Sequence, residues 1–348
     1  MHSRSPTPEN DTDLLAQMLA DEANQSALYK PGPYWAPYQR RVIAAIHRHG
    51  IAQFRRRADI CKGFADPGII WPSDLWWGWK GAMKRAISDM PLVRPIVQEY
   101  RAMEENTETS LRAMQAAWFE RVLPDLDLPD TTGAGAGDLV RLGDRDYSRQ
   151  YLLSALRSVN VTRAVRFDKM RAVMEIGGGF GFWPHLMLHR YPALRKVVYL
   201  DIPPMIYLAT QYLKMFHPVR DYRETRLLPE IRFRDDDSVE IICLCPWQIE
   251  KFRSPIDLLW NIASFSEMPP AIVRNYGKHI APLQPRAIYV MLNKDSEDRG
   301  TSTKEGVLSA LGGDFSLFVP PVSHPKDTPS YVAIHDGGVA VAKAGLQV

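Results

Sequence analysis

The chain has 348 residues, of which 45% are hydrophobic and 24% are charged, an ordinary composition for a globular protein. Its formal net charge of +3 comes from scattered lysines and arginines, with no basic stripe of the kind that follows a nucleic-acid backbone. No apolar run approaches the roughly 20 residues needed to cross a bilayer, and the three cysteines lack the spacing of a zinc site. We therefore expect a soluble cytoplasmic protein with neither a nucleic-acid nor a membrane partner.

The front of the chain has a helical pattern, because apolar residues recur there every three to four positions without a strand pattern of similar strength. The clearest segments are 14–25, 42–56 and 91–123. Residues 123–140 combine prolines, aspartates and alternating glycines, which is typical of a connector. We therefore expect a helical N-terminal or cap domain over residues 1–140, with residues 1–12 disordered, and a second domain over residues 141–348.

After a further helix expected over residues 146–159, short apolar strands alternate with helical stretches. The expected strands are Ala172–Ile176, Val197–Leu200, Glu240–Cys243, Ile256–Trp260 and Ala287–Leu292. Such alternation predicts a mostly parallel sheet covered by helices on both faces, which is a Rossmann-like α/β fold. Near the end of the chain, YVAIH and VAVAKA flank Asp-Gly-Gly, so an antiparallel hairpin is expected there.

The stretch VMEIGGGFGFWPHLML, residues 173–188, places a glycine-rich loop between an expected strand and an expected helix. Gly177, Gly179 and Gly181 are spaced as GxGxG at the carboxyl end of the strand, where open α/β sheets bind ligands. Asp201 ends the next strand, where an acidic side chain accepts hydrogen bonds from ribose hydroxyls. The alternative is a turn that only lets the helix pack closely on the strand.

Glu175 distinguishes between the possible ribose ligands. A dinucleotide site prefers GxGxxG, whereas the last spacing here is one residue shorter and Glu175 sits two residues before Gly177. A carboxylate there repels a pyrophosphate and suits a ligand with an ammonium group and a sulfonium, which is S-adenosylmethionine. A nicotinamide-dependent oxidoreductase is the alternative that this loop disfavours.

The loop resembles the first motif of class I S-adenosylmethionine-dependent methyltransferases, and together with YLDIPPMIYLATQYL and DLLWNIASFSEMP it resembles the sugar O-methyltransferase family. The resemblance is best over residues 171–293 and weaker over YKPGPYWAPYQ and GIAQFRR. It implies a seven-stranded, mostly parallel sheet with a terminal antiparallel hairpin, and methyl transfer to a hydroxyl of a sugar or glycan. The implied cofactor contacts are Glu175, Gly177, Gly178, Gly179, Phe180 and Gly181 around the methionine end, and Asp201 with Ile202 at the adenosine.

Two further loops follow expected strands. Trp247 and Gln248 lie where methyltransferases contact the adenine, although a buried tryptophan at a sheet edge is an equal alternative. Asn261 is a candidate for the cofactor or for a sugar hydroxyl, or else it satisfies backbone groups at the end of a strand. Ser264 and Phe265, in the same loop, are candidates for substrate binding.

An alcohol acceptor is a poor nucleophile until its proton is removed, so the reaction needs a base or a metal. Glu267 and His324 are the candidate bases; Glu267 is alternatively a favourable charge at a helix start, and His324 lies on a proline-rich loop. No metal is predicted, although Asp257, Glu267 and Asp295 could hold magnesium if they converge. His185 is expected to face outward from its helix and to be structural, and a structural role is also expected for His279.

Four tryptophans crowd into IIWPSDLWWGWKG, and Trp76 among them is a candidate acceptor contact. Aromatic faces stack on sugars, but such a cluster is more often core or an oligomer interface. We expect a homo-oligomer that acts on a small-molecule sugar or oligosaccharide. An amine or non-sugar natural product is the alternative acceptor, and a catalytically silent binding protein is a further alternative.

Overall fold

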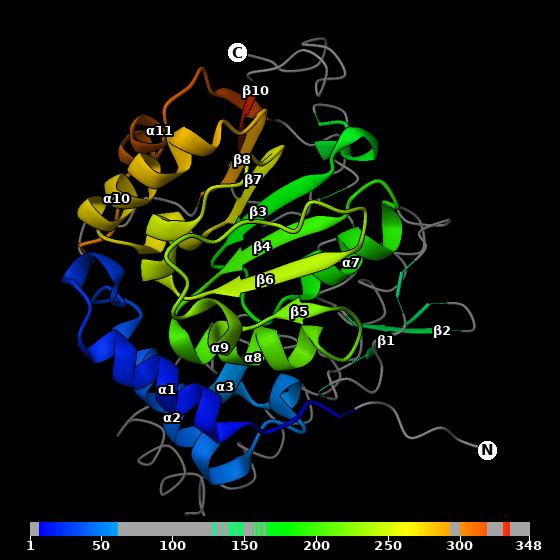
Figure 1. Cartoon of the computed structure of the whole chain (residues 1–348), viewed down its shortest axis with the longest axis vertical. Coiled ribbons are helices and arrows are strands. Elements are labelled where there is room, and N and C mark those ends of the chain that lie inside the picture. The colour runs from blue at the N-terminus through cyan, green and yellow to red at the C-terminus, as the bar shows by residue number, and fades with distance from the viewer. Residues whose placement is uncertain are drawn as a thin grey trace, which may run out of the picture.

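The centre of the protein is a large sheet with helices on both of its faces, seen in a computed structural model (Figure 1). The structure describes residues 7–61, 128–129, 135, 139–142, 145–148, 155, 158, 161–162, 165–292, 300–318 and 330–334. His324, Asp295, Trp76 and the expected strand VAVAKA lie outside these residues.

The large sheet has eight strands in the order β5-β6-β4-β3-β7-β8-β10-β9. Their bounds are β3 (Ala172–Ile176), β4 (Lys196–Leu200), β5 (Val219–Arg220), β6 (Glu240–Leu244), β7 (Leu258–Ile262), β8 (Ala287–Met291), β9 (Ser316–Phe318) and β10 (Ser330–Ile334). All neighbours from β5 to β8 are parallel, whereas β10 runs antiparallel to both β8 and β9. This is the predicted Rossmann-like fold with an antiparallel edge. The strands β5 and β9 were not predicted, and the antiparallel partner of β10 among the described residues is β9, which precedes it in the chain, whereas VAVAKA was expected.

The five strands predicted from apolar runs are all present, with ends that differ by at most two residues. The helix expected over residues 146–159 is wrong at its start, because β2 (Arg145–Ser148) pairs there with β1 (Leu139–Leu142) in a separate two-stranded sheet. The dipeptide between these strands is Gly-Asp, which is typical of two-residue hairpin loops. A turn signal was therefore overlooked in favour of a helical pattern.

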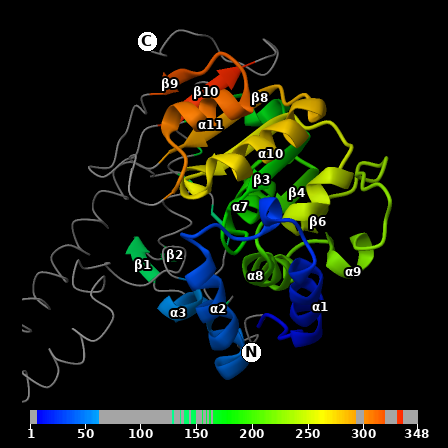
Figure 2. The same ribbon diagram turned by 90° about the vertical axis from the view of Figure 1, so that its left-hand side faces the viewer.

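The helices form two layers, which Figure 2 shows separated by the strands. The described α-helices are α1 (Thr12–Ala23), α2 (Ala36–His49), α3 (Ala58–Cys61), α7 (Phe182–Arg190), α8 (Pro203–Leu213), α9 (Tyr222–Thr225), α10 (Pro270–Ile280) and α11 (Lys304–Leu311). Short 3-10 helices are η1 (Ala27–Tyr29), η2 (Phe54–Arg56), η4 (Phe167–Lys169), η5 (Pro246–Lys251), η6 (Ser264–Glu267) and η7 (Ala281–Leu283).

Successive residues of each strand point to opposite faces, so each face has its own hydrophobic core. Val173 and Trp260 belong to the core with α7, α8 and the N-terminal helices α1 and α2, whereas Met174 belongs to the core with α10 and α11. The N-terminal helices thus pack in the same core as one face of the sheet. Because both faces are covered, ligands have access chiefly at the ends of the strands.

The first described residues are held against the α8 layer. Tyr207 donates a hydrogen bond of 3.0 Å to Asn10 Oδ1, and Arg223 forms an ion pair with Asp11. Asp11 also caps α1 by accepting a hydrogen bond of 3.1 Å from the Leu14 N–H. Disorder was expected as far as residue 12, whereas these contacts fix residues 10 and 11.

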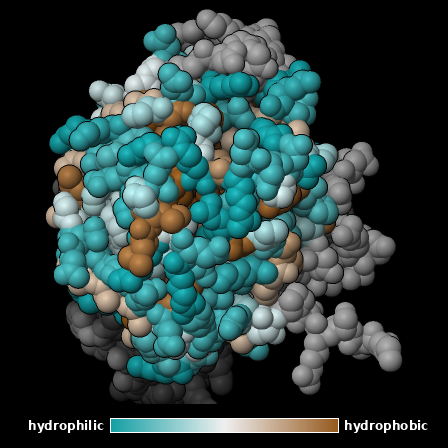
Figure 3. Space-filling model, in the orientation of Figure 1, coloured by the Kyte–Doolittle hydropathy of each residue, from teal (hydrophilic) through white to brown (hydrophobic). Residues whose placement is uncertain are grey.

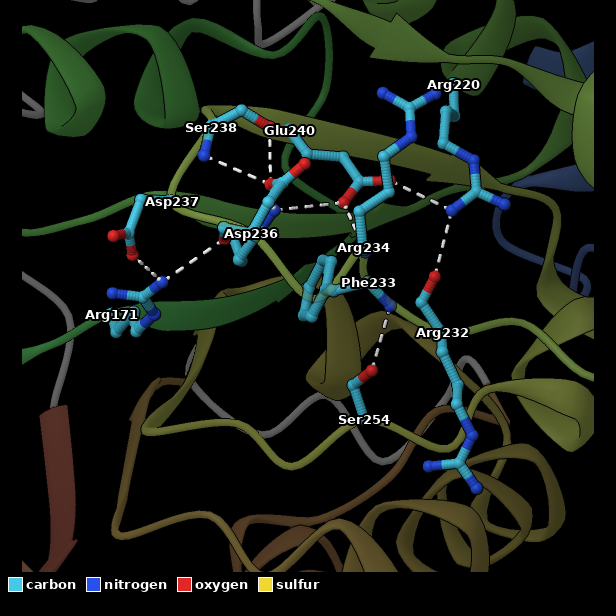
Figure 4. A network of polar contacts seen from close by, with 11 residues as sticks. Arg171, Arg220, Arg232, Phe233, Arg234, Asp236, Asp237, Ser238, Glu240 and Ser254 are labelled. Carbon is cyan, nitrogen blue, oxygen red and sulfur yellow. Dashed lines mark hydrogen bonds and ion pairs between the residues drawn. The ribbon is translucent and has the colours of Figure 1, made fainter.

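A charged network closes the amino ends of the strands (Figure 4). Glu240, at the start of β6, accepts hydrogen bonds of 2.9 Å from Arg220 Nη1 and 2.8 Å from the Arg234 N–H. Lys196, at the start of β4, lies 3.4 Å from Glu240 and 2.8 Å from Asp236. These groups satisfy one another at this end of the sheet.

The face of the molecule in Figure 3 is mostly hydrophilic, with hydrophobic residues gathered near its middle. Among the residues that the structure describes, Leu227 is the most exposed large hydrophobic residue, with an exposed fraction of 82%. Within the described part of the chain, every helix is too short or too polar to cross a bilayer.

Candidate functional site

The glycine loop leaves the carboxyl end of β3 and leads into α7. Gly177, Gly179 and Gly181 have φ angles of +71°, +79° and +86°, which side chains rarely adopt. A Cβ atom on Gly177 would also lie 2.3 Å from Ser264 Oγ. A glycine is therefore required at position 177, because of its backbone conformation and because the loop after β7 leaves no room for a Cβ atom. Phe180, within the glycine loop, is fully buried and packs edge-on against Tyr212.

The carboxyl group of Glu175 lies directly beneath this loop. A Cβ atom on Gly178 would fall 2.3 Å from Glu175 Cδ, and the Glu175 residue is only 1% exposed. Its Oε2 atom has no hydrogen-bond partner among the described residues. Burial raises the pKa of Glu175 well above its usual range, and the nearby Asp201 raises it further. A buried acceptor without a partner is costly, so this oxygen is suited to receive a donor from a ligand.

Asp201 follows β4 and faces the same loop. It accepts hydrogen bonds of 3.2 Å from the Gly179 N–H and 2.8 Å from the Ile202 N–H. Burial raises its pKa to about 7, although these two hydrogen bonds lower it, and the carboxylate of Glu267 adds to the increase. Two neighbouring carboxyl groups with raised pKa values at the carboxyl edge of an α/β sheet identify a candidate ligand site.

A cavity of about 50 Å³ opens beside Gly177 and Asp201. From the sheet side it is lined by Gly177, Asp201, Ile202, Met205, Pro246, Ser264, Met268, Ile272 and Tyr276. From the N-terminal side it is lined by Leu28, Tyr29, Lys30, Pro31, Gly32 and Trp35. We call residues 26–35 the strap, because they cover this cavity. The strap was not predicted to belong to the site, because the local signal of the strap is limited to the prolines and aromatic residues of YKPGPYW.

The loop after β7 is tied to the end of β3. Asn261 Nδ2 donates hydrogen bonds of 2.8 Å to the Ile176 carbonyl and 2.5 Å to Ser264 Oγ, and Ser264 Oγ donates one of 2.9 Å to the same carbonyl. Asn261 is fully buried, and its amide satisfies a backbone carbonyl at the strand end, which was the structural alternative among its expected roles. Ser264 lines the cavity, whereas Phe265 is fully buried and packs against Tyr276.

The loop after β6 holds the two residues predicted at the adenine. Gln248 is 1% exposed, accepts a hydrogen bond of 2.9 Å from the Cys245 N–H and donates one of 3.0 Å to Thr225 Oγ1. Trp247 is half-buried and lies edge-on to Tyr222, with ring centroids 5.9 Å apart. In this loop it is Pro246 that lines the cavity. The side chain of Gln248 is thus engaged within the fold.

Glu267 is half-buried at the end of η6, between residues that line the cavity. Trp35 Nε1 of the strap donates a hydrogen bond of 2.8 Å to Glu267 Oε2. Pro270 begins α10, so the helix start expected after Glu267 is confirmed. Of the two candidate bases, Glu267 therefore lies on a loop whose residues Ser264 and Met268 line the cavity, and its charge raises the pKa of Asp201, whereas His324 lies outside the described residues.

The structure separates two of the three carboxylates that were considered for magnesium. Asp257 precedes β7 and accepts hydrogen bonds of 2.7 Å and 2.9 Å from the backbone of Arg171 and Ala172. Glu267 follows the same strand, and five residues of strand span about 16 Å. Within the described residues no group of three histidine, cysteine or acidic side chains could hold a metal ion.

His185 does not face outward as expected. It is only 6% exposed, stacks on Phe216 with ring centroids 4.1 Å apart, and its Nδ1 lies 2.8 Å from His217 Nε2. The outward expectation was wrong because Phe216 and His217, which follow α8, cover this side of α7. The structural role expected for His185 agrees with this packing.

No protein-family model and no curated protein matches the chain. Among solved structures, it is similar to an O-methyltransferase family protein from Burkholderia thailandensis, with 14% identity and a TM-score of 0.37 over 54% of this chain and 57% of that one. It is also similar to human N-acetylserotonin methyltransferase in complex with SAM (15%, TM-score 0.33, 53% of each chain) and to mitomycin 7-O-methyltransferase (15%, TM-score 0.34, 53% and 56%). The chain spans about half the length of each of these structures.

Proposed function

We propose that the chain binds S-adenosylmethionine and transfers its methyl group to a hydroxyl of a small molecule. The observation that carries this proposal is the fully buried Glu175 carboxyl beneath the glycine loop, whose Oε2 has no partner among the described residues. An ammonium group supplies the missing donors, and a cationic ligand stabilises the ionised form of Glu175.

The other residues of the site fit the remaining parts of the same ligand. Asp201 uses its two oxygens for one backbone N–H each, and an ionised carboxylate has further lone pairs for ribose hydroxyls. The glycines at 177, 179 and 181 let a ligand approach the backbone closely. A pyrophosphate would instead meet the carboxyl groups of Glu175 and Asp201, which disfavours a dinucleotide.

The bound cofactor supplies a methyl group on a positively charged sulfur. In-line transfer to the acceptor oxygen would break the carbon–sulfur bond and leave its electron pair on sulfur, and the Glu267 carboxylate would take up the acceptor proton. The enzyme contributes mainly by holding these atoms in line and by accepting the proton. Glu267 is our candidate for the proton acceptor, because it lies on the loop next to Ser264 and Met268 of the cleft.

A sugar or glycan hydroxyl is the acceptor that we propose, supported by the family resemblance of DLLWNIASFSEMP and its flanking motifs. An amine or a non-sugar natural product remains the competing acceptor. Incubation of the protein with labelled S-adenosylmethionine and panels of sugars, amines and phenolic compounds separates the two. A chelator added in parallel tests for metal dependence.

Calorimetry with S-adenosylhomocysteine, S-adenosylmethionine and NAD tests the cofactor. We expect the first two to bind, and we expect Glu175→Gln to weaken both by at least about tenfold, because a charged hydrogen bond is lost. Retention of NAD, or no binding of either sulfur nucleoside, contradicts the proposal. Glu267→Ala should leave nucleoside affinity intact and lower turnover by about 100-fold or more. Full activity of Glu267→Ala with loss in His324→Ala would transfer the base role to His324.

A further inference from the structure

The strap is fastened at three points to the loops that follow β6 and β7. Tyr29 donates a hydrogen bond to Glu250, and its hydroxyl lies 3.2 Å from His279 Nε2. Gly32 packs against Pro269, and Trp35 Nε1 donates to Glu267 Oε2 at 2.8 Å. The residues that cover the cavity are thus in direct contact with the proposed proton acceptor.

Gly32 determines how the strap enters α2. A Cβ atom at this position would lie 2.5 Å from Pro269 Cδ, and a proline ring cannot move aside as a flexible side chain can. The Gly32 carbonyl accepts hydrogen bonds of 3.0 Å from the Trp35 N–H and 2.9 Å from the Ala36 N–H, which opens α2. The contact between Gly32 and Pro269 therefore fixes the direction from which the Trp35 ring reaches Glu267.

The backbone on both sides of Glu267 is anchored independently of the strap. Ser266 Oγ donates a hydrogen bond of 2.6 Å to the Ala263 carbonyl, and Ser302 donates from its N–H and its Oγ, each at 2.8 Å, to the Met268 carbonyl. Ala263 adopts a left-handed φ of +64°, an uncommon conformation that is often found at functional sites. The turn that carries Glu267 is thus held by hydrogen bonds from Ser266 and Ser302, which lie outside the strap. The Glu267 carboxylate, in contrast, accepts a hydrogen bond from Trp35 of the strap.

We propose that Trp35 is a positioning residue whose indole N–H holds the Glu267 carboxylate at the cleft. This inference rests on the proposed function, in which Glu267 accepts the proton of the acceptor. The strap lines one side of the cavity next to Gly177 and Asp201, so the hydrogen bond from Trp35 reaches Glu267 from the side that covers the site.

The hydrogen bond can be tested without any acceptor, by NMR of protein labelled with ¹⁵N-tryptophan. Trp35→Phe identifies the Trp35 indole resonance by its disappearance. We expect this resonance to move with pH as Glu267 titrates, and to lose that dependence in Glu267→Gln. A resonance that is the same in wild type and Glu267→Gln at every pH overturns the inference. This result does not depend on whether the protein is a methyltransferase.

The role in positioning is tested by kinetics once an acceptor is found. Trp35→Phe keeps the ring and removes only the donor, so we expect kcat to fall by roughly tenfold with little change in S-adenosylmethionine affinity. In a Glu267→Gln background the same substitution should have no further effect, because the two residues act together. Equal losses in both backgrounds overturn the proposal. Tyr38→Phe, on a ring 5.5 Å from Trp35, is the matched control and should retain full activity.

Discussion

Gly177 and Ser264 are in contact across the carboxyl ends of β3 and β7, so closely that a Cβ atom on Gly177 would lie 2.3 Å from Ser264 Oγ. The same Ser264 hydroxyl donates to the Ile176 carbonyl at 2.9 Å, immediately before the glycine loop. The proposed cofactor loop and the proposed acceptor loop are therefore packed together as one unit. A change that moves Gly177 must also displace the turn that carries Glu267.

We predict that Gly177→Ala weakens binding of S-adenosylhomocysteine, because it adds both a strained left-handed φ and a clash with Ser264. Calorimetry should show a loss of at least about tenfold in affinity, or about 1.4 kcal/mol. Gly312→Ala is the matched control, since Gly312 has a similar φ of +68° with no described atom within 4 Å of the added Cβ. Equal losses of affinity in the two variants would show that the effect is not local to the glycine loop and would contradict the prediction.

The strands and the glycine loop could be predicted because their signals are local. Apolar runs of about five residues gave the bounds of β3 without error, and the GxGxG spacing identified the positions that need a positive φ. The strap could not be found in this way. Trp35 and Glu267 are separated by 232 positions along the chain, and no periodicity links them. A tertiary contact of that kind is decided by the packing of the whole fold.

The difference between local signals and tertiary contacts also explains why the positions of some residues were predicted correctly while their hydrogen-bond and packing partners were not. Gln248 lies in the expected loop, yet its amide is bonded to Thr225 of α9, which comes from another part of the chain. His185 lies on the expected helix, but its burial depends on Phe216 and His217 beyond α8. A sequence pattern places a residue on an element and leaves its partners to the tertiary structure.

The pKa of Asp201, raised to about 7 from an ordinary value near 3.8, makes the stability of the ligand-free protein depend on pH. A carboxyl whose pKa is raised by folding stabilises the protein below pH 4, and this contribution is lost as the pH rises to 7. Asp201→Asn removes the titration. We therefore predict that the melting temperature of the variant minus that of wild type rises by a few degrees from pH 4 to pH 8. This figure already allows for the partial exposure of Asp201 at the cleft. A difference that is the same at both pH values contradicts this assignment.

The buried histidines His185 and His217 should make stability depend on pH in the opposite direction from Asp201. Burial lowers the pKa of His185 to about 3 and that of His217 to about 4, so their contribution is present above about pH 6.5 and is lost as the pH falls. His185→Phe preserves stacking on Phe216 and cannot be protonated. The unfolding free energy of the variant minus that of wild type should therefore rise by about 2 kcal/mol when the pH is lowered from 7.5 to 4.5. Urea denaturation at the two pH values measures this difference. An unfolding free energy that changes with pH by the same amount in wild type and in the variant contradicts this assignment.

Glu240 should be the most sensitive member of the charged network at the amino ends of the strands. Its side chain is 1% exposed and is shared by Arg220 and Lys196, which are themselves 14% and 5% exposed. Removing one member of a buried ion pair leaves its partners desolvated without compensation, so Glu240→Gln should lower the unfolding free energy by about 3 kcal/mol. Asp237→Asn is the control within the same network, because Asp237 is 87% exposed in its pair with Arg171 and should have no measurable effect. Urea denaturation at neutral pH measures both, and a similar loss in the two variants would mean that burial does not decide the strength of these pairs.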